Sequence, residues 1–162
     1  MTRILVFSDS HGETNRMIKT IQNLPSVDGI IHLGDLNRDI TELEDNFFEI
    51  PIYGVQGNND HTGLYPNEKI LTIDGKKIFI THGHYYLFGL DPEPLKTVPS
   101  TEGAELILYG HTHIAYTEKY DGKILANPGS ISRPRTGAPS YGVIEIEDGI
   151  LRYCNILIPE IF

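Results

Sequence analysis

The sequence predicts an α/β protein in which two mixed sheets pack face to face with helices on the outside. Two observations lead to this prediction. In the first third of the chain, short apolar runs alternate with amphipathic stretches, which is typical of parallel strands joined by helices. After residue 69 the apolar runs come in pairs around glycine-containing turns, which is typical of antiparallel hairpins. We expect one domain over residues 1–162, because this length suits a single core.

The first half predicts three parallel strands with two helical connections. Residues 4–7 form an apolar run, and apolar side chains then recur at helical spacing over residues 17–24 until Pro25. Residues 29–33 and 52–55 are further apolar runs, separated by an amphipathic stretch that continues through Leu43. Right-handed crossovers return each strand in the same direction, so the three strand ends are expected at one edge of a sheet, where ligands bind.

The second half predicts hairpins over residues 70–81, 117–127 and 142–153, each with an Asp-Gly turn between apolar runs. Between the first two, residues 91–105 contain three prolines and are expected to form a short helix or a lid-like loop.

Charge and composition exclude some classes of function. The formal net charge of -9 argues against non-specific binding to nucleic acid, which needs clustered basic residues. No apolar run reaches the ~18 residues of a membrane span, and the first residues do not resemble a signal peptide. We expect a soluble cytoplasmic protein that does not bind membranes. The single cysteine, Cys154, is predicted to be a small buried hydrophobic residue rather than a catalytic thiol.

Residue types that ligate metals gather at the predicted strand ends. They form the segments Asp9-Ser-His11, Gly34-Asp35, Gly57-Asn58-Asn59-Asp60, His82-Gly-His84 and Gly110-His111-Thr-His113. Each segment alone has an ordinary explanation, such as a helix cap or a polar turn. Five such segments in sequence, each after an apolar run, favour a pair of divalent metals bound by oxygen and imidazole ligands. A carboxylate such as Asp35 is the natural bridging ligand, and Asp60 could fix the loop by accepting a hydrogen bond.

This series of motifs resembles the calcineurin-like metallophosphoesterase superfamily, and the short chain with Asn-Pro-Gly-Ser at 127–130 is similar to its small prokaryotic, YfcE-type phosphodiesterase branch. The resemblance implies a four-layer αββα sandwich and two divalent ions, manganese first, with nickel, iron, cobalt or zinc as alternatives. It implies that a hydroxide bridging the ions hydrolyses a small phosphodiester, with phosphomonoesters as further substrates. The implied ligands are Asp9, His11 and His113 for one ion, Asn58, His82 and His111 for the other, and Asp35 for both.

One position departs from the wider superfamily. Asn59 stands where many members have a histidine that contacts substrate and protonates the leaving oxygen, although the small phosphodiesterase branch commonly lacks that histidine too. A positioned acid contributes about 100- to 10,000-fold, so we expect substrates with good leaving groups. His84, or alternatively His61, is a candidate acid. The expected catalytic residues are therefore Asp35, Asn59 and His84, and the expected substrate contacts are Asn59, Ser130 and Arg133.

Other classes of function remain as alternatives. A retromer subunit shares this fold and much of its metal pocket, yet works as a protein-binding scaffold, so a weak or silent enzyme is the main rival. A sensor that binds phosphate without cleaving it is another. No Gly-x-Ser-x-Gly or P-loop motif occurs, which argues against a serine hydrolase and a P-loop nucleotidase. Residues 91–105, together with Tyr85, Tyr86 and Phe88, are expected to shape the pocket mouth or a homodimer contact, with an ordinary packed loop as an equal alternative.

Overall fold

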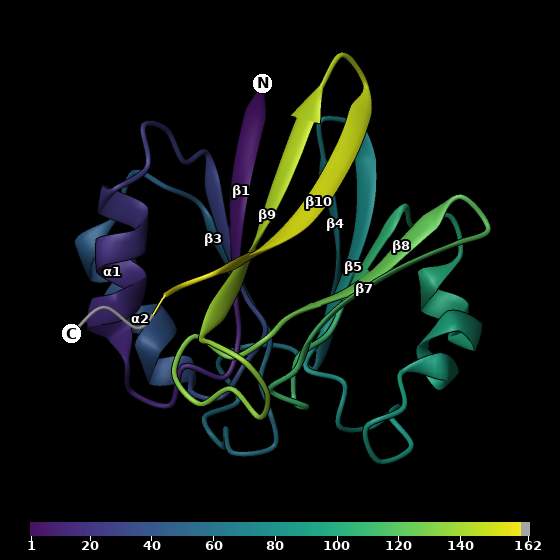
Figure 1. Ribbon diagram of the computed structural model, residues 1–162, viewed down its shortest axis with the longest axis horizontal. Coiled ribbons are helices and arrows are strands. Elements are labelled where there is room, and N and C mark those ends of the chain that lie inside the picture. Colours follow the sequence, from purple (N-terminus) through teal and green to yellow (C-terminus); the bar gives the residue numbers. More distant parts are fainter. Residues whose placement is uncertain (160–162) are drawn as a thin grey trace.

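Two five-stranded sheets pack face to face in the computed structural model, which describes residues 1–159 (Figure 1). The first sheet has the order β10-β9-β1-β2-β3 and is covered by two α-helices. Its elements are β1 (Thr2–Phe7), α1 (Thr14–Gln22), β2 (Gly29–His32), α2 (Asn37–Asn46), β3 (Ile52–Gly54), β9 (Ser140–Glu147) and β10 (Ile150–Leu157).

The second sheet has the order β4-β5-β6-β8-β7, and two short 3-10 helices cover its outer face. Its elements are β4 (Glu68–Ile73), β5 (Lys76–Thr81), η1 (Glu93–Thr97), η2 (Pro99–Thr101), β6 (Leu106–Leu108), β7 (Ala115–Tyr120) and β8 (Lys123–Pro128). The predicted α/β sandwich of two mixed sheets is confirmed, with η1 and η2 as its thin fourth layer.

The parallel half agrees with the sequence pattern. Strand β1 pairs in parallel with β2, and β2 pairs in parallel with β3, with α1 and α2 as the connections. All three strands therefore end at the lower edge in Figure 1, where their loops gather. Strand β9 returns along the other side of β1 in the antiparallel direction, which makes the sheet mixed.

The three predicted hairpins are present as β4-β5, β7-β8 and β9-β10. Each turns at an aspartate with positive φ followed by a glycine with positive φ, as tight two-residue hairpin turns require. The expected dominance of antiparallel pairing after residue 69 needs one correction. The short strand β6 pairs in parallel with both β5 and β8, because longer connections bring it back in the same direction.

Alternating side chains divide the interior into three apolar layers. Ile4 and Val6 of β1 face the space between the sheets, while Leu5 and Phe7 face the helices. Strand β6 repeats this division, with Leu106 and Leu108 between the sheets and Ile107 under the 3-10 helices. Strands β2 and β6 are buried throughout, and β1 and β5 are buried over their last four residues, so all four strands lead from the apolar interior to the loops at one edge of the sandwich.

The prediction for Cys154 was wrong. Its side chain is exposed and lies in a shallow groove with Leu24, Pro25 and Tyr141. Strand β10 is the edge of its sheet, where alternate side chains turn outward and helix α1 covers them only in part. Among the described residues, no helix is both long and apolar enough to cross a bilayer.

Candidate metal centre

The side chains expected to bind metal converge at one edge of the sandwich, from both sheets. In the first sheet, Asp9 and His11 follow β1, Asp35 follows β2 and Asn58 follows β3. In the second sheet, His82 follows β5, and His111 and His113 follow β6. Contacts between their side chains link all seven residues into a single cluster.

The backbone at this edge is unusual. Eight described residues other than glycine have positive φ, and three of them are the hairpin aspartates. The other five are expected metal ligands, namely Asp9, His11, Asp35, His111 and His113, with φ between 43° and 68°. The left-handed conformation costs roughly 1 kcal/mol or more for such residues, so it persists only where the surroundings fix it, and it concentrates at functional sites.

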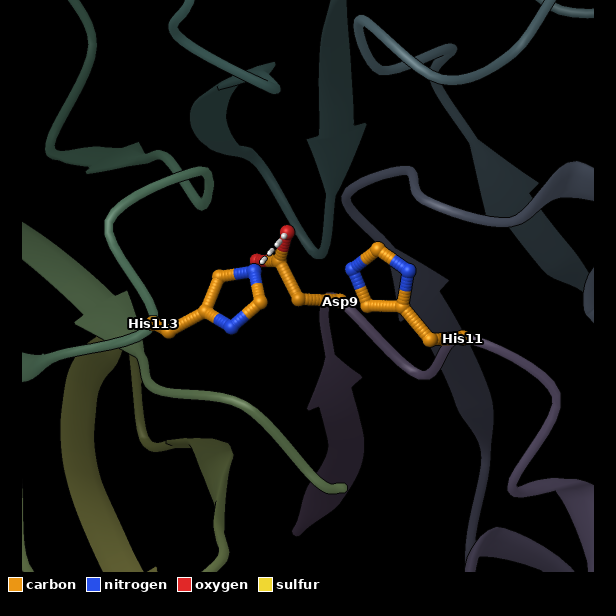
Figure 2. Close-up of side chains that lie close together, drawn as sticks. All are labelled: Asp9, His11 and His113. Carbon is orange, nitrogen blue, oxygen red and sulfur yellow. Dashed lines mark ion pairs between the residues drawn. The ribbon is translucent and has the colours of Figure 1, made fainter. Parts of the chain in front are cut away.

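One oxygen of Asp9 is anchored and the other is free. Its Oδ2 accepts hydrogen bonds from the hydroxyl of Ser8, at 2.6 Å, and from the backbone N–H of His111, at 3.1 Å. Its Oδ1 is buried, has no hydrogen-bond partner among the described residues, and lies 3.2 Å from Nε2 of His113. Figure 2 shows Asp9 between the rings of His11 and His113. Nε2 of His11 is likewise buried without a partner within the described chain.

Two imidazoles are oriented by backbone carbonyls. Nδ1 of His82 donates to the carbonyl oxygen of Leu33 at 2.7 Å, and Nδ1 of His113 donates to that of Arg133 at 2.7 Å. With the proton on Nδ1, each neutral ring turns an Nε2 lone pair toward the cluster. Metal-binding histidines are commonly held in this way.

Asp35 lies between the two groups of ligands. Its Oδ2 is 3.8 Å from Nε2 of His11 and 3.7 Å from Nε2 of His82. Asn59 holds the same carboxylate through its backbone N–H, at 3.0 Å, and its side-chain amide, at 2.7 Å.

Asn58 closes the other side of the cluster. Its Oδ1 lies 3.0 Å from Nε2 of His82 and 3.0 Å from Nδ1 of His111. Because His82 carries its proton on the opposite ring nitrogen, two lone pairs face each other across one of these contacts. A cation placed among such donors relieves this repulsion, so the side chains present fit a divalent metal.

The pKa directions support the same assignment. Burial lowers the pKa of His11 and of His111, which leaves both rings neutral and able to ligate at pH 7. Burial raises the pKa of Asp9, but its close contacts with His113, His82 and the hydroxyl of Ser8 outweigh burial and hold that pKa below its usual value. The nearby carboxylate of Asp9 raises the pKa of His113.

Two glycines are required by close approach to the carboxylates. A Cβ atom at Gly57 would lie 2.0 Å from Oδ1 of Asp35, and one at Gly110 would lie 2.9 Å from Oδ2 of Asp9 and 2.1 Å from Oγ of Ser8. Neither glycine has positive φ. Their role here is therefore the absence of a side chain, which lets the loops pack against the ligands.

Asp60 fixes the loops on either side of it. Its Oδ2 accepts from the backbone N–H of Asp35 at 2.9 Å and of Gly57 at 2.7 Å, and its Oδ1 accepts from that of Asn37 at 2.8 Å. These three bonds are the arrangement that the sequence suggested for Asp60, and they tie the loop after β2 to the loop after β3.

A buried polar network behind the loop after β1 was not foreseen. The hydroxyl of Ser10 donates to Oδ2 of Asp39 at 2.6 Å and lies 2.8 Å from Nε2 of His32. The same Asp39 oxygen accepts from the backbone N–H of Gly12 at 2.8 Å. The serine between Asp9 and His11 was visible in the sequence. Its partners lie in β2 and α2, where single polar residues carry no recognisable motif.

The expected substrate contacts occupy different environments. Arg133 is exposed, its carbonyl oxygen accepts from Nδ1 of His113, and its charge helps to lower the pKa of His11. Ser130 is buried, and its hydroxyl donates to the carbonyl oxygen of Asp9 at 2.8 Å and accepts from the backbone N–H groups of Ser132 and Arg133. A hydroxyl has one donor and two acceptor positions, so Ser130 has none left for the expected phosphate contact.

The two candidate acids differ in position. The ring of His84 lies 5.4 Å from that of His82 and 6.2 Å from that of His111, measured between centroids. Burial lowers the pKa of His84, and its Nδ1 has no hydrogen-bond partner in the described part of the chain. His61 is exposed in the loop between β3 and β4, and no contact with the cluster is found for it among the described residues. Only His84 therefore adjoins the candidate metal ligands.

Comparison with known proteins finds a family that matches most of this chain. The model of the calcineurin-like phosphoesterase superfamily domain matches residues 2–149. A probable metallophosphoesterase of Bacillus subtilis, YsnB, is 38% identical over 151 residues, which are 90% of this chain and 85% of that protein. The phosphodiesterase MJ0936 of Methanocaldococcus jannaschii is 27% identical over 161 residues, 90% of this chain and 93% of its own.

Solved structures share the fold. A predicted phosphoesterase from Streptococcus pneumoniae has a TM-score of 0.80 and 30% identity, covering 96% of this chain and 89% of its own. Zinc-bound Vps29 from Entamoeba histolytica has a TM-score of 0.75 and 22% identity, covering 96% of this chain and 99% of its own. At that identity the second likeness concerns the fold alone.

Proposed function

Because this chain belongs to the calcineurin-like phosphoesterase superfamily, we propose that it hydrolyses phosphodiesters with two divalent metal ions. The proposed ligands are Asp9, His11 and His113 for one ion, Asn58, His82 and His111 for the other, and Asp35 for both. Bound divalent ions lower the pKa of coordinated water toward neutrality and neutralise charge on phosphoryl oxygens.

The position of Asp35 is the observation that carries the proposal of two ions. One of its oxygens is within 3.8 Å of a nitrogen from each proposed ligand set, His11 on one side and His82 on the other. Two groups of three side chains also have their ligand atoms within 4.8 Å of one another. They are Asp9, His11 and His113 in one group and Asp9, Asp35 and His82 in the other. Manganese is the proposed ion, with nickel, iron, cobalt and zinc as alternatives, since mixed oxygen and imidazole ligands suit all five.

The chain's own residues hold the reacting groups in place. Asn59 bonds Asp35 in the metal-free protein and, as an exposed residue next to Asn58, is proposed to contact a phosphoryl oxygen once the ions are bound. Arg133, which is exposed and whose charge helps to lower the pKa of His11, is proposed to bind a second oxygen. Ser130 is assigned a positioning role instead, because its hydroxyl holds the carbonyl oxygen of Asp9.

His84 is the remaining candidate for protonating the leaving group. It lies beside two proposed ligands and has an unpaired ring nitrogen within the described residues. No histidine stands at position 59, where a proton donor would be next to the metal-binding asparagine. Diesters with good leaving groups are therefore the proposed substrates, and phosphomonoesters are secondary ones.

The protein-binding scaffold remains the rival function. The presence of all seven proposed ligands favours the enzyme, since a scaffold needs no free Asp9 oxygen turned toward two imidazoles. Turnover is the property that separates the two.

The test is hydrolysis of bis(p-nitrophenyl) phosphate with added manganese, together with elemental analysis of the loaded protein. We expect two manganese ions per chain and turnover that disappears on chelation. Asp35→Asn and His82→Ala should reduce turnover to near the background rate, while His61→Ala, which changes an exposed histidine outside the cluster, should leave it unchanged. Metal-independent turnover, or full activity in both ligand variants, would refute the mechanism, and absence of turnover with every metal would favour the scaffold.

A further inference from the structure

Tyr85 is an exposed aromatic residue beside the candidate metal centre. It is 70% exposed, although the next two residues, Tyr86 and Leu87, pack against the apolar layer under the 3-10 helices. Phe88 and Leu90 of the same segment are exposed as well, and a group of exposed apolar side chains is typical of a binding surface.

The backbone around Tyr85 is fixed in this orientation. The N–H groups of Tyr86 and Leu87 both donate to the carbonyl oxygen of Gly83, at 2.9 and 3.0 Å. The hydroxyl of Tyr86 donates to Glu68, and Leu87 packs so closely on Gly83 that an added Cβ there would lie 2.7 Å from its Cδ1. The turn thus packs Tyr86 and Leu87 against the protein and leaves Tyr85 facing outward.

A continuous series of rings connects Tyr85 with the proposed ligands. Its ring centroid is 4.0 Å from that of His84, with an angle of 39° between the planes. The ring of His84 is in turn 5.4 Å from His82 and 6.2 Å from His111. Tyr85 is therefore separated from two proposed ligands by a single ring, with His84 in contact with it and most of its own surface open to solvent.

We propose that Tyr85 stacks against an aromatic group of the substrate, and that the substrate class is nucleotide-like phosphodiesters, in which a planar base lies one sugar away from the phosphate. This inference rests on the proposed function. Stacking of a base on an aromatic side chain contributes about 1–3 kcal/mol, and it needs neither charge nor a specific hydrogen bond. Stacking would therefore strengthen substrate binding without relying on charge. This matters because the protein is acidic overall and attracts anions only locally.

The test compares two probes that differ only by a base. Adenosine 5′-monophosphate and ribose 5-phosphate are titrated into the manganese-loaded protein by calorimetry, which does not depend on turnover. We expect the adenosine probe to bind about 5- to 150-fold more tightly, which corresponds to that stacking energy. Tyr85→Ala should bring the two affinities to within about twofold, while Tyr85→Phe and Tyr85→Trp should keep the difference.

The control is Phe48→Ala, because Phe48 is 83% exposed but lies between α2 and β3, at the opposite edge of the sheet. It should preserve the preference for adenosine 5′-monophosphate. Equal affinities of the wild-type protein for both probes would overturn the inference, and so would a preference that survives Tyr85→Ala. Conversion of a dimer to a monomer by Tyr85→Ala, with no change in the ratio of affinities, would identify the segment as a contact between copies and also overturn it.

Failure of the proposed function gives a different result. If neither probe binds the manganese-loaded protein and no diester is hydrolysed, the metallophosphoesterase site itself is wrong, and the inference falls with it. If both probes bind equally and diesters are hydrolysed, the function stands and only the role of Tyr85 is refuted.

Discussion

Replacement of Gly57 by alanine should disable the metal centre without changing any proposed ligand. The new Cβ would lie 2.0 Å from Oδ1 of Asp35 and 2.8 Å from its Cγ, whereas real Cβ contacts essentially never fall below 3.0 Å. The carboxylate must therefore move by about 1 Å or more, and its two hydrogen bonds with Asn59 must break or bend. A misplacement of about 1 Å in an active site can cost about 100-fold in rate.

The control for this experiment is Gly29→Ala. Gly29 is also buried and also lacks positive φ, and a Cβ there would meet Cδ1 of Ile4 at 2.7 Å. That atom is the far end of a flexible side chain, so it can move aside at small cost. Both variants change the same residue type, but only Gly57→Ala pushes on a proposed metal ligand.

The assay measures manganese binding by calorimetry and kcat/KM for bis(p-nitrophenyl) phosphate, with circular dichroism to establish that each variant is folded. We expect Gly57→Ala to lose about 100-fold or more in kcat/KM and to bind manganese more weakly, and Gly29→Ala to stay within about threefold of wild type. A folded Gly57→Ala protein with wild-type manganese affinity and kcat/KM would refute the argument that Asp35 must occupy its observed position.

Three further predictions concern stability. Asp60→Ala leaves three backbone N–H groups without their acceptor, so it should lower the free energy of unfolding by about 3 kcal/mol or more in urea titrations. Asp60→Asn should have a smaller effect. Equal stability of Asp60→Ala and the wild-type protein would contradict this prediction. Burial lowers the pKa of His32 to about 4, so the folded metal-free protein binds fewer protons than the unfolded one, and stability should fall by about 3 kcal/mol as pH drops from 6.5 to about 4. His32→Gln should flatten that part of the stability curve, and an identical pH dependence in both proteins would exclude the effect. Manganese at 100 times the wild-type Kd should raise the free energy of unfolding of the wild-type protein by about 2.7 kcal/mol, measured by thermal unfolding. At the same concentration it should raise that of His82→Ala by much less. An equal gain in both proteins would show that the ion binds elsewhere.

Patterns that are local in the sequence predicted most of the fold. Apolar runs and helical spacing located the parallel half, and Asp-Gly pairs located all three hairpins, because turn type depends on adjacent residues. The pairing of β6 was missed, since a three-residue strand has too few side chains to indicate its neighbours. The exposure of Cys154 was missed as well, because an apolar run does not reveal which face of an edge strand is covered.

In the candidate site, too, features that depend on local sequence were predictable and features that depend on contacts between distant segments were not. The types of side chain at the strand ends could be recognised in the sequence, and topology explains why they converge. The use of the Ser130 hydroxyl inside the loop, and the approach of Gly57 to Asp35, depend on contacts between distant segments. The sequence shows that residue 57 is a glycine, but only the folded structure shows how closely this glycine approaches Asp35.

The division of the cluster between the two sheets has a mechanical consequence. Four of the seven side chains come from loops of one sheet and three from loops of the other, and across this edge the carboxylates of Asp9 and Asp35 face imidazoles. Ions bound there would join the two sheets by coordination bonds, in addition to the apolar packing between them and hydrogen bonds such as those from His82 to Leu33 and from His111 to Asp9. Pulling the sheets apart, for instance in a single-molecule force measurement, should meet its greatest resistance at this seam when the protein is loaded with manganese.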